Sequence, residues 1–435
     1  MSNNDETTTT TYPTGEWFDH ARFGMFIHWD HASQHGWEVS WPLVGGVFSL
    51  PKSQQTTAGE YHALAATFDP TSYDPAALAR RASAAGMRYV VFTTRHHSGY
   101  AMFDTSTTEH KVSNSPYSSP SGRDIVRETF DAFRAEGLRI GVYYSLSDWH
   151  HPDYPAWTEE FRPYKLGLSP PLPTDEQADR FRADLMTQLR ELLTDYGQID
   201  VVWFDGGWER PAPWWHPDEI ESLIRTLQPG ALINDRLPGV GDFATPEQFV
   251  PALPPTGRWE SCMTLNDSWG FNPDDTHYKS PRAIVNTLCE TAAKGGNLLL
   301  NISPTGDGVI PEQQCERLDA VATWMSHHAR AIHDTTPGLE PWQFYGPSTR
   351  CGDVINLMLV MRPYDTVTVR GLPVRRIGEI TVMGTGRSLE FTTRTGLIEM
   401  LMPDPEGEVI ITVPDTELDE YVTVVTVEIT PVATP

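Results

Sequence analysis

The stretch that decides the fold is Val201–Gly207, which reads Val-Val-Trp-Phe-Asp-Gly-Gly. Four apolar residues in succession are typical of a strand in a parallel sheet that is covered on both faces. Asp205 closes this strand, and two glycines follow it. α/β barrels build their active sites at this end of their strands. Asp205 could instead cap the next helix, but that helix is predicted to begin only at Pro217.

Strands and helices alternate from residue 17 to about 330. The predicted strands are Phe23–Trp29, Met87–Thr94, Arg139–Ser145, Ile199–Asp205, Ala231–Asp235, Trp259–Met263 and Asn297–Ile302. The predicted helices are Pro75–Ala85, Asp124–Glu136, Asp175–Asp195, Pro217–Leu227, Pro281–Ala293 and Pro311–Arg330. Such alternation is typical of a (β/α)8 barrel or of a doubly wound sheet.

Polar side chains at the strand ends favour the barrel. They come from six or more different strands: His28, His96, His97, Tyr144, Asp205, Arg236 and Glu260. A doubly wound sheet would concentrate its ligands at one switch point and usually carries a glycine-rich phosphate loop. The sequence has no such loop. We therefore predict an α/β fold with a (β/α)8-like TIM barrel.

Beyond Trp342 the pattern changes to short, alternating, β-branched segments separated by glycine and proline. The predicted strands are Val367–Arg370, Arg376–Val382, Leu389–Thr393, Val409–Val413 and Tyr421–Ile429. They indicate a small C-terminal antiparallel β-sandwich. The predicted organisation is a disordered N-terminus over residues 1–15, a catalytic barrel over 16–335 and the sandwich over 340–435.

Composition excludes several classes of function. The 435 residues carry a formal net charge of −26, which disfavours binding to nucleic acid or to an anionic membrane. The polar, threonine-rich N-terminus does not resemble a signal peptide, so we expect a cytoplasmic protein. The four cysteines form no C-x-x-C pair and are expected to be free thiols.

A second carboxylate, Glu260, lies in the segment Trp259-Glu260-Ser261-Cys262 on a later predicted strand. Two carboxylates from separate strands are the minimum set for glycoside cleavage, one as nucleophile or base and the other as acid. The alternative is that Glu260 forms an ion pair with Arg236 or Arg258.

Histidines follow two of the strands, in Phe26-Ile27-His28 and in Arg95-His96-His97. Neutral imidazoles suit sugar hydroxyls, but they could also bind a metal ion. Adjacent residues of a strand point to opposite faces, which disfavours one ion bound by both His96 and His97. We therefore expect no catalytic metal and no cofactor, and a metal-dependent hydrolase stays as the alternative.

Aromatic side chains near the strand ends include Trp41, Trp203 and Trp269. Their flat faces suit the C–H face of a sugar ring, although buried tryptophans often serve only the core.

Together these motifs resemble the α-L-fucosidases of glycoside hydrolase family 29. The resemblance rests on ordered segments over residues 17 to about 330: Ala21–Trp29, Thr94–Gly99, Gly122–Asp124, Gly141–Ser145, Trp203–Gly206, Trp259–Trp269 and Gly295–Pro304. It implies a retaining exo-α-L-fucosidase that acts on fucosylated oligosaccharides or glycoconjugates without a metal. A noncatalytic fucose-binding module is the other alternative, and the presence of both Asp205 and Glu260 disfavours it.

The resemblance also implies roles for single residues. Asp205 matches the nucleophile, and the matched fucose-binding positions are His28, His96, His97, Tyr144, Trp203 and Arg236, with a looser match at Glu38. For the acid/base we select Glu260, with Asp267 and Glu38 as rivals. Two positions depart from the family pattern, Asp30 and Ser98, and they bear on leaving-group specificity. The linkage preference and the oligomeric state stay open.

Overall fold

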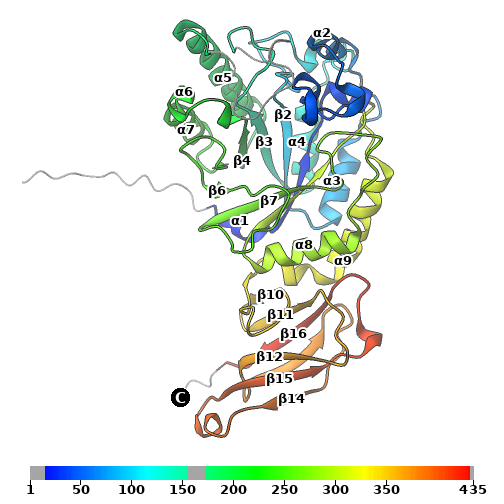
Figure 1. Ribbon diagram of the computed structural model, residues 1–435, viewed down its shortest axis with the longest axis vertical. Coiled ribbons are helices and arrows are strands. Elements are labelled where there is room, and N and C mark those ends of the chain that lie inside the picture. The colour runs from blue at the N-terminus through cyan, green and yellow to red at the C-terminus, as the bar shows by residue number, and fades with distance from the viewer. Residues whose placement is uncertain (1–14, 155–171, 432–435) are drawn as a thin grey trace, which may run out of the picture.

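The computed structural model describes residues 15–154 and 172–431. A parallel barrel forms the N-terminal part, and an antiparallel sandwich forms the C-terminal part (Figure 1). The predicted disorder of the N-terminus falls on residues outside the described ones, apart from Gly15.

The barrel sheet has the strand order β5-β4-β3-β2-β1-β8-β7-β6, with all neighbours parallel. Its strands are β1 (Phe23–Ile27), β2 (Tyr89–Arg95), β3 (Arg139–Ser145), β4 (Val201–Asp205), β5 (Leu232–Ile233), β6 (Phe243–Ala244), β7 (Arg258–Thr264) and β8 (Asn297–Ile302). An isolated bridge between Asn234 and Phe243 joins the two edges and nearly closes the sheet. This is the predicted TIM-barrel order.

Helices surround the barrel, and their starts follow from the sequence. The helices are α1 (Glu16–Ala21), α2 (Ala58–Ala63), α3 (Pro75–Ala84), α4 (Ile125–Ala135), α5 (Asp175–Asp195), α6 (Ala212–Trp215), α7 (Pro217–Leu227), α8 (Pro281–Ala293) and α9 (Glu312–Ile332). Asp74 and Ser280 cap α3 and α8 through their side chains, and a proline occupies the first helical turn in each case.

The predicted barrel elements coincide with the observed ones to within two residues at most ends, but β6 was not predicted. It has only two residues, too few to show a hydrophobic period. The inward-facing side chains of the other strands form their own buried cluster, which includes Phe26, Tyr89, Trp203 and Cys262. The barrel is thus filled below its mouth, as expected for eight strands.

The sandwich packs a sheet of order β13-β16-β11-β10-β9 on one of order β12-β15-β14. Its strands are β9 (Thr336–Pro337), β10 (Ser348–Cys351), β11 (Val354–Leu359), β12 (Thr366–Pro373), β13 (Ile377–Val382), β14 (Phe391–Arg394), β15 (Glu406–Thr412) and β16 (Thr423–Ile429). The first three were not predicted. A separate apolar core lies between the sheets.

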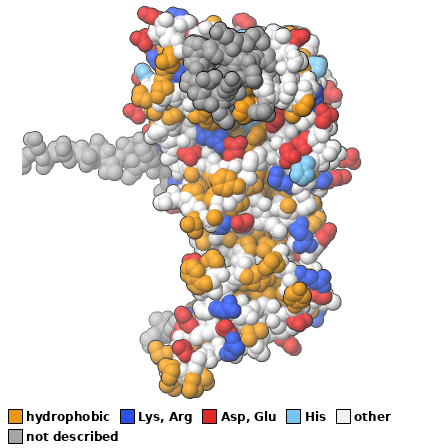
Figure 2. Space-filling view, viewed as in Figure 1, with side chains coloured by type: hydrophobic (Ala, Val, Ile, Leu, Met, Phe, Trp, Pro, Cys, Tyr) orange, Lys and Arg blue, Asp and Glu red, His pale blue; other side chains and the backbone are white. Residues whose placement is uncertain are grey.

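α8 and α9 lie between the barrel strands and the sandwich (Figure 1). Trp324 of α9 donates its indole N–H to the carbonyl of Val422 at 2.9 Å, and Met358 and Val424 belong to the core of the barrel side. At the far tip of the sandwich, Figure 2 shows apolar side chains, and the β14–β15 connection exposes Leu397, Ile398, Met400, Leu401 and Met402.

Among the described helices, none has the length and apolar character needed to cross a membrane. All four cysteines are free, as predicted.

Candidate active site

Asp205, the last residue of β4, is the centre of a polar group at the barrel mouth. Arg236, in the loop after β5, donates from Nη1 to Oδ1 of Asp205 at 2.9 Å. The hydroxyl of Tyr143, on β3, donates to Oδ2 at 2.7 Å. Nε2 of His97 lies 3.5 Å from the same oxygen. Four elements of the barrel therefore meet at one carboxylate.

The surroundings of Asp205 keep it ionised. Burial alone would raise its pKa, but the guanidinium of Arg236 and the hydrogen bond from Tyr143 outweigh burial and hold the pKa below its usual value. The side chain is 11% exposed. An ionised carboxylate that reaches the mouth and is turned toward it by two donors fits a nucleophile.

The three predicted binding histidines are each anchored through Nδ1. Nδ1 of His28 bonds to Oδ1 of Asn301 at 2.7 Å. Nδ1 of His96 bonds to the hydroxyl of Ser40 at 2.6 Å, and Nδ1 of His97 bonds to the hydroxyl of Ser145 at 2.6 Å. In His28 and His97 the partner fixes the tautomer. Asn301 accepts through its carbonyl oxygen, since its amide nitrogen donates to the backbone carbonyl of Trp269. The hydroxyl of Ser145 donates to the carbonyl of Ser147 and therefore accepts from His97.

Nδ1 of both rings therefore carries the proton, and Nε2 is left as an acceptor. Burial lowers the pKa of His28 and His97 to about 4 and that of His96 well below its usual value. Neutral rings of this kind can accept hydrogen bonds from hydroxyl groups.

Aromatic rings form the floor and walls of the mouth. Tyr143 stacks on Trp203 with ring centroids 5.6 Å apart and on His96 at 5.6 Å. Trp269 packs on His28 at 4.8 Å, and Trp41 lies 5.8 Å from His97. The structure thus brings the predicted aromatic residues Trp41, Trp203 and Trp269 to the same site.

Glu260 lies elsewhere, below this floor. It is the third residue of β7, a strand that begins at Arg258 and continues to Thr264, so it lies near the amino end of the strand. The side chain is completely buried. One carboxylate oxygen accepts from the indole of Trp203 at 3.0 Å and the other from the hydroxyl of Tyr89. The sequence analysis grouped Glu260 with the polar side chains at the carboxyl ends of strands, and this grouping is wrong, because Glu260 lies near the amino end of β7.

Burial raises the pKa of Glu260 to about 7, and the bonds from Tyr89 and Trp203 offset part of this effect. Its position removes the reason for assigning it as proton donor, because Trp203 separates it from the mouth.

Glu247 is the carboxylate that the sequence analysis missed. It follows β6 in a loop, and its Oε2 accepts from Nη2 of Arg236 at 2.8 Å. Arg236 thus bonds Asp205 with one nitrogen and Glu247 with the other. The Glu247 side chain is 40% exposed, so it reaches solvent. A glutamate in a loop without hydrophobic periodicity gives no local signal, and only the spatial proximity of Arg236 reveals it.

The two rival carboxylates take other positions. Oε1 of Glu38 accepts from the backbone N–H of Trp269 at 2.6 Å, and burial raises the pKa of Glu38 to about 7. Glu38 therefore supports the segment that carries Trp269. Asp267 is 70% exposed and pairs with His277, away from Asp205.

Tyr144 is not part of the site. Its hydroxyl donates to Gln188 at 2.9 Å, and its ring lies under the guanidinium of Arg95 at 4.2 Å. Consecutive residues of a strand point to opposite faces, so Tyr144 faces the helix layer and Tyr143 faces the barrel interior. The sequence-based placement of Tyr144 is thus off by one residue, and Tyr143 takes its place.

The two departures from the family pattern are both buried. Asp30 accepts from the backbone N–H of Ala32 at 2.8 Å, and burial raises its pKa to about 7. The backbone N–H of Ser98 donates to the hydroxyl of Ser40, which also bonds His96. Among the described residues, the one group of three possible metal ligands is His62, His110 and His150, and it does not include Asp205 or the anchored histidines.

A family model described as Alpha-L-fucosidase matches residues 2–330. Human tissue α-L-fucosidase is 29% identical over 427 residues, which is 92% of this chain and 85% of the human one. The bovine tissue enzyme is 30% identical over 345 residues, 75% of this chain and 70% of its own. Among solved structures, α-L-fucosidase isoenzyme 1 from Paenibacillus thiaminolyticus has a TM-score of 0.81 at 34% identity and covers 96% of this chain and 98% of its own. The α-fucosidase of Thermotoga maritima in complex with a mechanism-based inhibitor has a TM-score of 0.75 at 28% identity, over 95% and 96% of the two chains.

Proposed function

Because the chain belongs to the α-L-fucosidase family, glycoside hydrolase family 29, we propose that it removes terminal α-L-fucose from fucosylated oligosaccharides or glycoconjugates with retention of configuration. The observation that carries the proposal is that one guanidinium, that of Arg236, bonds both Asp205 and Glu247. Such bridging is compatible with a retaining pair, whose carboxyl groups lie about 5–5.5 Å apart.

In the first step, an oxygen of Asp205 attacks the anomeric carbon, and the bond from that carbon to the leaving oxygen breaks. Glu247 gives its proton to the leaving oxygen, so that an alcohol departs and a fucosyl-enzyme ester forms. Tyr143 and Arg236 hold the attacking carboxylate ionised and in place.

In the second step, water takes the place of the alcohol. Glu247 now accepts a proton from that water, whose oxygen attacks the anomeric carbon and releases Asp205. The exposure of Glu247 supports this role, because the water of the second step must reach it from solvent. Glu260 is not proposed for it, because its two oxygens are both occupied beneath Trp203.

The sugar itself is recognised by neutral donors and acceptors on an aromatic floor. The outward nitrogens of His28 and His97 accept from fucose hydroxyls, and Trp269 and Trp203 offer apolar faces to the ring. The floor under the site is closed by Phe26 and Trp203, with ring centroids 5.1 Å apart. A site closed below suits a terminal sugar, which supports exo action.

The proposal is tested with 4-nitrophenyl α-L-fucoside. We expect turnover, and NMR of the first product should show α-L-fucose before mutarotation. Release of the β anomer first would contradict retention, and cleavage of other glycosides in preference to fucosides would contradict the substrate class. The cytoplasmic location stays a prediction, which fractionation of the producing cells would test.

A further inference from the structure

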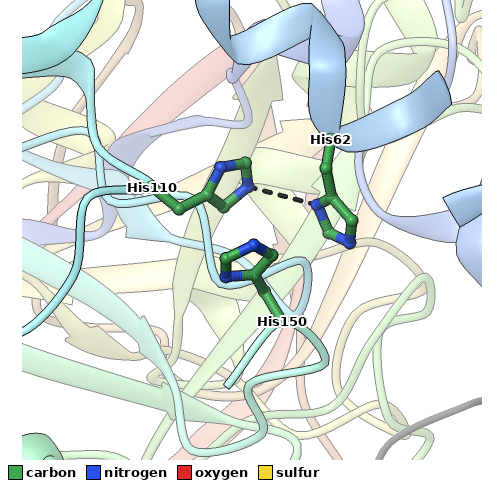
Figure 3. Close-up of side chains that lie close together, drawn as sticks. All are labelled: His62, His110 and His150. Atoms are coloured by element: carbon green, nitrogen blue, oxygen red, sulfur yellow. Dashed lines mark hydrogen bonds between the residues drawn. The ribbon is translucent and has the colours of Figure 1, made fainter. Parts of the chain in front are cut away.

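Three histidines outside the proposed catalytic site converge at the barrel mouth (Figure 3). His62 lies on α2, His110 in the connection between β2 and α4, and His150 just after β3. One ring nitrogen from each histidine lies within 4.8 Å of the corresponding nitrogens of the other two. They come from the loops that follow β1, β2 and β3, so residues far apart in the sequence meet at a single point.

The spacing of the nitrogens fits a metal ion. Nδ1 of His62 and Nε2 of His110 are 3.2 Å apart. Two nitrogens bound to one tetrahedral zinc ion, each at about 2.0–2.1 Å, lie about 3.3 Å apart. His150 stacks beside His110, with ring centroids 4.1 Å apart, and its ligand nitrogen lies within 4.8 Å of those of the other two rings.

The chemistry of the surroundings fits as well. In the described part of the chain, the contact between His62 and His110 is the one hydrogen bond that the ring nitrogens of this triad make. No described carboxylate joins the three imidazoles. The ring of His31 lies 5.5 Å from that of His110, and both ring nitrogens of His31 are buried without a hydrogen-bond partner.

We propose that His62, His110 and His150 bind one zinc ion, with water in the fourth position on the exposed side of His150. Imidazole nitrogens are ligands that zinc prefers, and three of them with one open position form a common zinc coordination set. The ion would join three loops of the barrel mouth. One of them carries Trp149, whose ring lies 5.0 Å from that of His97.

The experiment measures metal binding, not turnover. The full-length protein is freed of metal by dialysis against a chelator, equilibrated with zinc chloride and separated from unbound ion, and zinc per chain is determined by elemental analysis. We expect one equivalent. Titration with cobalt should give the visible absorption of a four-coordinate cobalt ion, and addition of zinc should abolish it.

His150→Ala and His62→Ala are the decisive variants, because their rings are less buried than that of His110. Removal of a hydrogen-bond partner behind a ligand costs about 10–100-fold in metal affinity, so we expect loss of a ligand itself to cost about 100-fold or more. His327→Ala, an exposed histidine of α9, is the matched control and should bind zinc as the parent protein does.

A parent protein without bound zinc would overturn the proposal, as would His150→Ala and His62→Ala variants that bind zinc as tightly as the parent protein. Circular dichroism establishes that each variant is folded. If one variant does not fold, the other decides the outcome. Loss of zinc from the triad variants with unchanged fucoside hydrolysis would support the site independently of the proposed catalytic function.

Discussion

Asp205 and Glu247 lie at the barrel mouth, whereas Glu260 lies beneath the aromatic floor. The mouth carboxylates share the guanidinium of Arg236 and reach solvent. Glu260 is completely buried and bonds to Tyr89 and Trp203. Asp205 ends β4, Glu247 lies three residues beyond β6, and Glu260 is the third residue of β7. Their surroundings differ accordingly: the mouth residues are open to a substrate, and Glu260 supports the floor below.

A shifted pKa does not by itself identify a catalytic acid. The pKa of Glu260 is raised to about 7, a value suited to a general acid, but no substrate atom can reach it through Trp203. Access and the shared guanidinium of Arg236 favour Glu247 as the proposed acid/base. Four substitutions test this difference between the mouth and the floor.

The largest effect is expected for Asp205→Ala. Removal of the nucleophile should lower kcat by about ten-thousand-fold or more, because no other described carboxylate contacts Arg236 and Tyr143 together. Steady-state hydrolysis of 4-nitrophenyl α-L-fucoside measures it. Azide should partly restore turnover of Asp205→Gly and give a fucosyl azide of inverted configuration. Asp267→Ala, an exposed aspartate, is the control, and near-parental activity of Asp205→Ala would refute the assignment.

Glu247→Ala should show a smaller loss that depends on the leaving group. General acid catalysis contributes about 10²–10⁴-fold, and a poor leaving group needs the proton most. We therefore expect the full loss with an alkyl fucoside and little loss with a dinitrophenyl fucoside.

Azide should accelerate the Glu247→Ala variant and give a product of retained configuration, the opposite of the Asp205→Gly product. Glu38→Ala and Asp267→Ala provide the comparison, since both were candidates for the same role. If either of them, or Glu260→Ala, shows the dependence on leaving group and Glu247→Ala does not, the proposed acid/base is wrong.

Much of the fold followed from the sequence because the barrel strands are apolar and the helices carry caps. The segment Val201–Asp205 and the capped start at Pro281 were located to within two residues. β6 and β9 escaped prediction because each has two residues and acquires its conformation from its neighbours.

Site residues that end a long strand could be predicted from the sequence. Residues whose role depends on their depth in the barrel, or on the face of the strand that carries them, were harder to predict. Asp205, His28 and His97 meet as expected. Tyr143 and Tyr144 are adjacent tyrosines, and one of them must face the barrel interior and the other the helices. The sequence of this strand does not show which one faces inward; the pairing of Tyr143 with Trp203 on the neighbouring strand does. Glu247 depends on a long-range contact with Arg236, which no local pattern contains.

Tyr143→Phe tests the assignment of faces. It removes the hydrogen bond to Asp205, and a bond to a charged group is worth about 1.5–3 kcal/mol, so kcat/KM should fall about 10- to 100-fold. Because this bond lowers the pKa of Asp205, its loss should move the acid limb of the pH profile of kcat/KM to higher pH.

Tyr144→Phe is the matched control for Tyr143→Phe. It removes a bond to Gln188 on the outer face, so we expect activity within about twofold and a loss of stability of about 1 kcal/mol. Equal losses of activity in the two variants would contradict the placement of the two rings.

Of the four test substitutions, Glu260→Gln should have the smallest effect on activity, within about threefold, and a clear effect on the pH dependence of stability. The folded-state pKa of about 7 lies above the ordinary value of 4.5, so the folded protein retains a proton that the unfolded chain releases between these values. The stability that this proton provides is complete below about pH 4.5 and is lost as the pH rises to about 7, by about 3 kcal/mol at most, at about 1.4 kcal/mol for each pKa unit.

Glutamine keeps the shape and cannot ionise; its oxygen can accept from Trp203 while its amide donates to Tyr89. Thermal unfolding should therefore depend less on pH between 5 and 8 in Glu260→Gln than in the parent protein. Glu399→Gln, at the exposed tip of the sandwich, should follow the parent curve. If the Glu260→Gln and parent curves are parallel, Glu260 does not retain its proton in the folded protein, and the contrast between mouth and floor would have to rest on access alone.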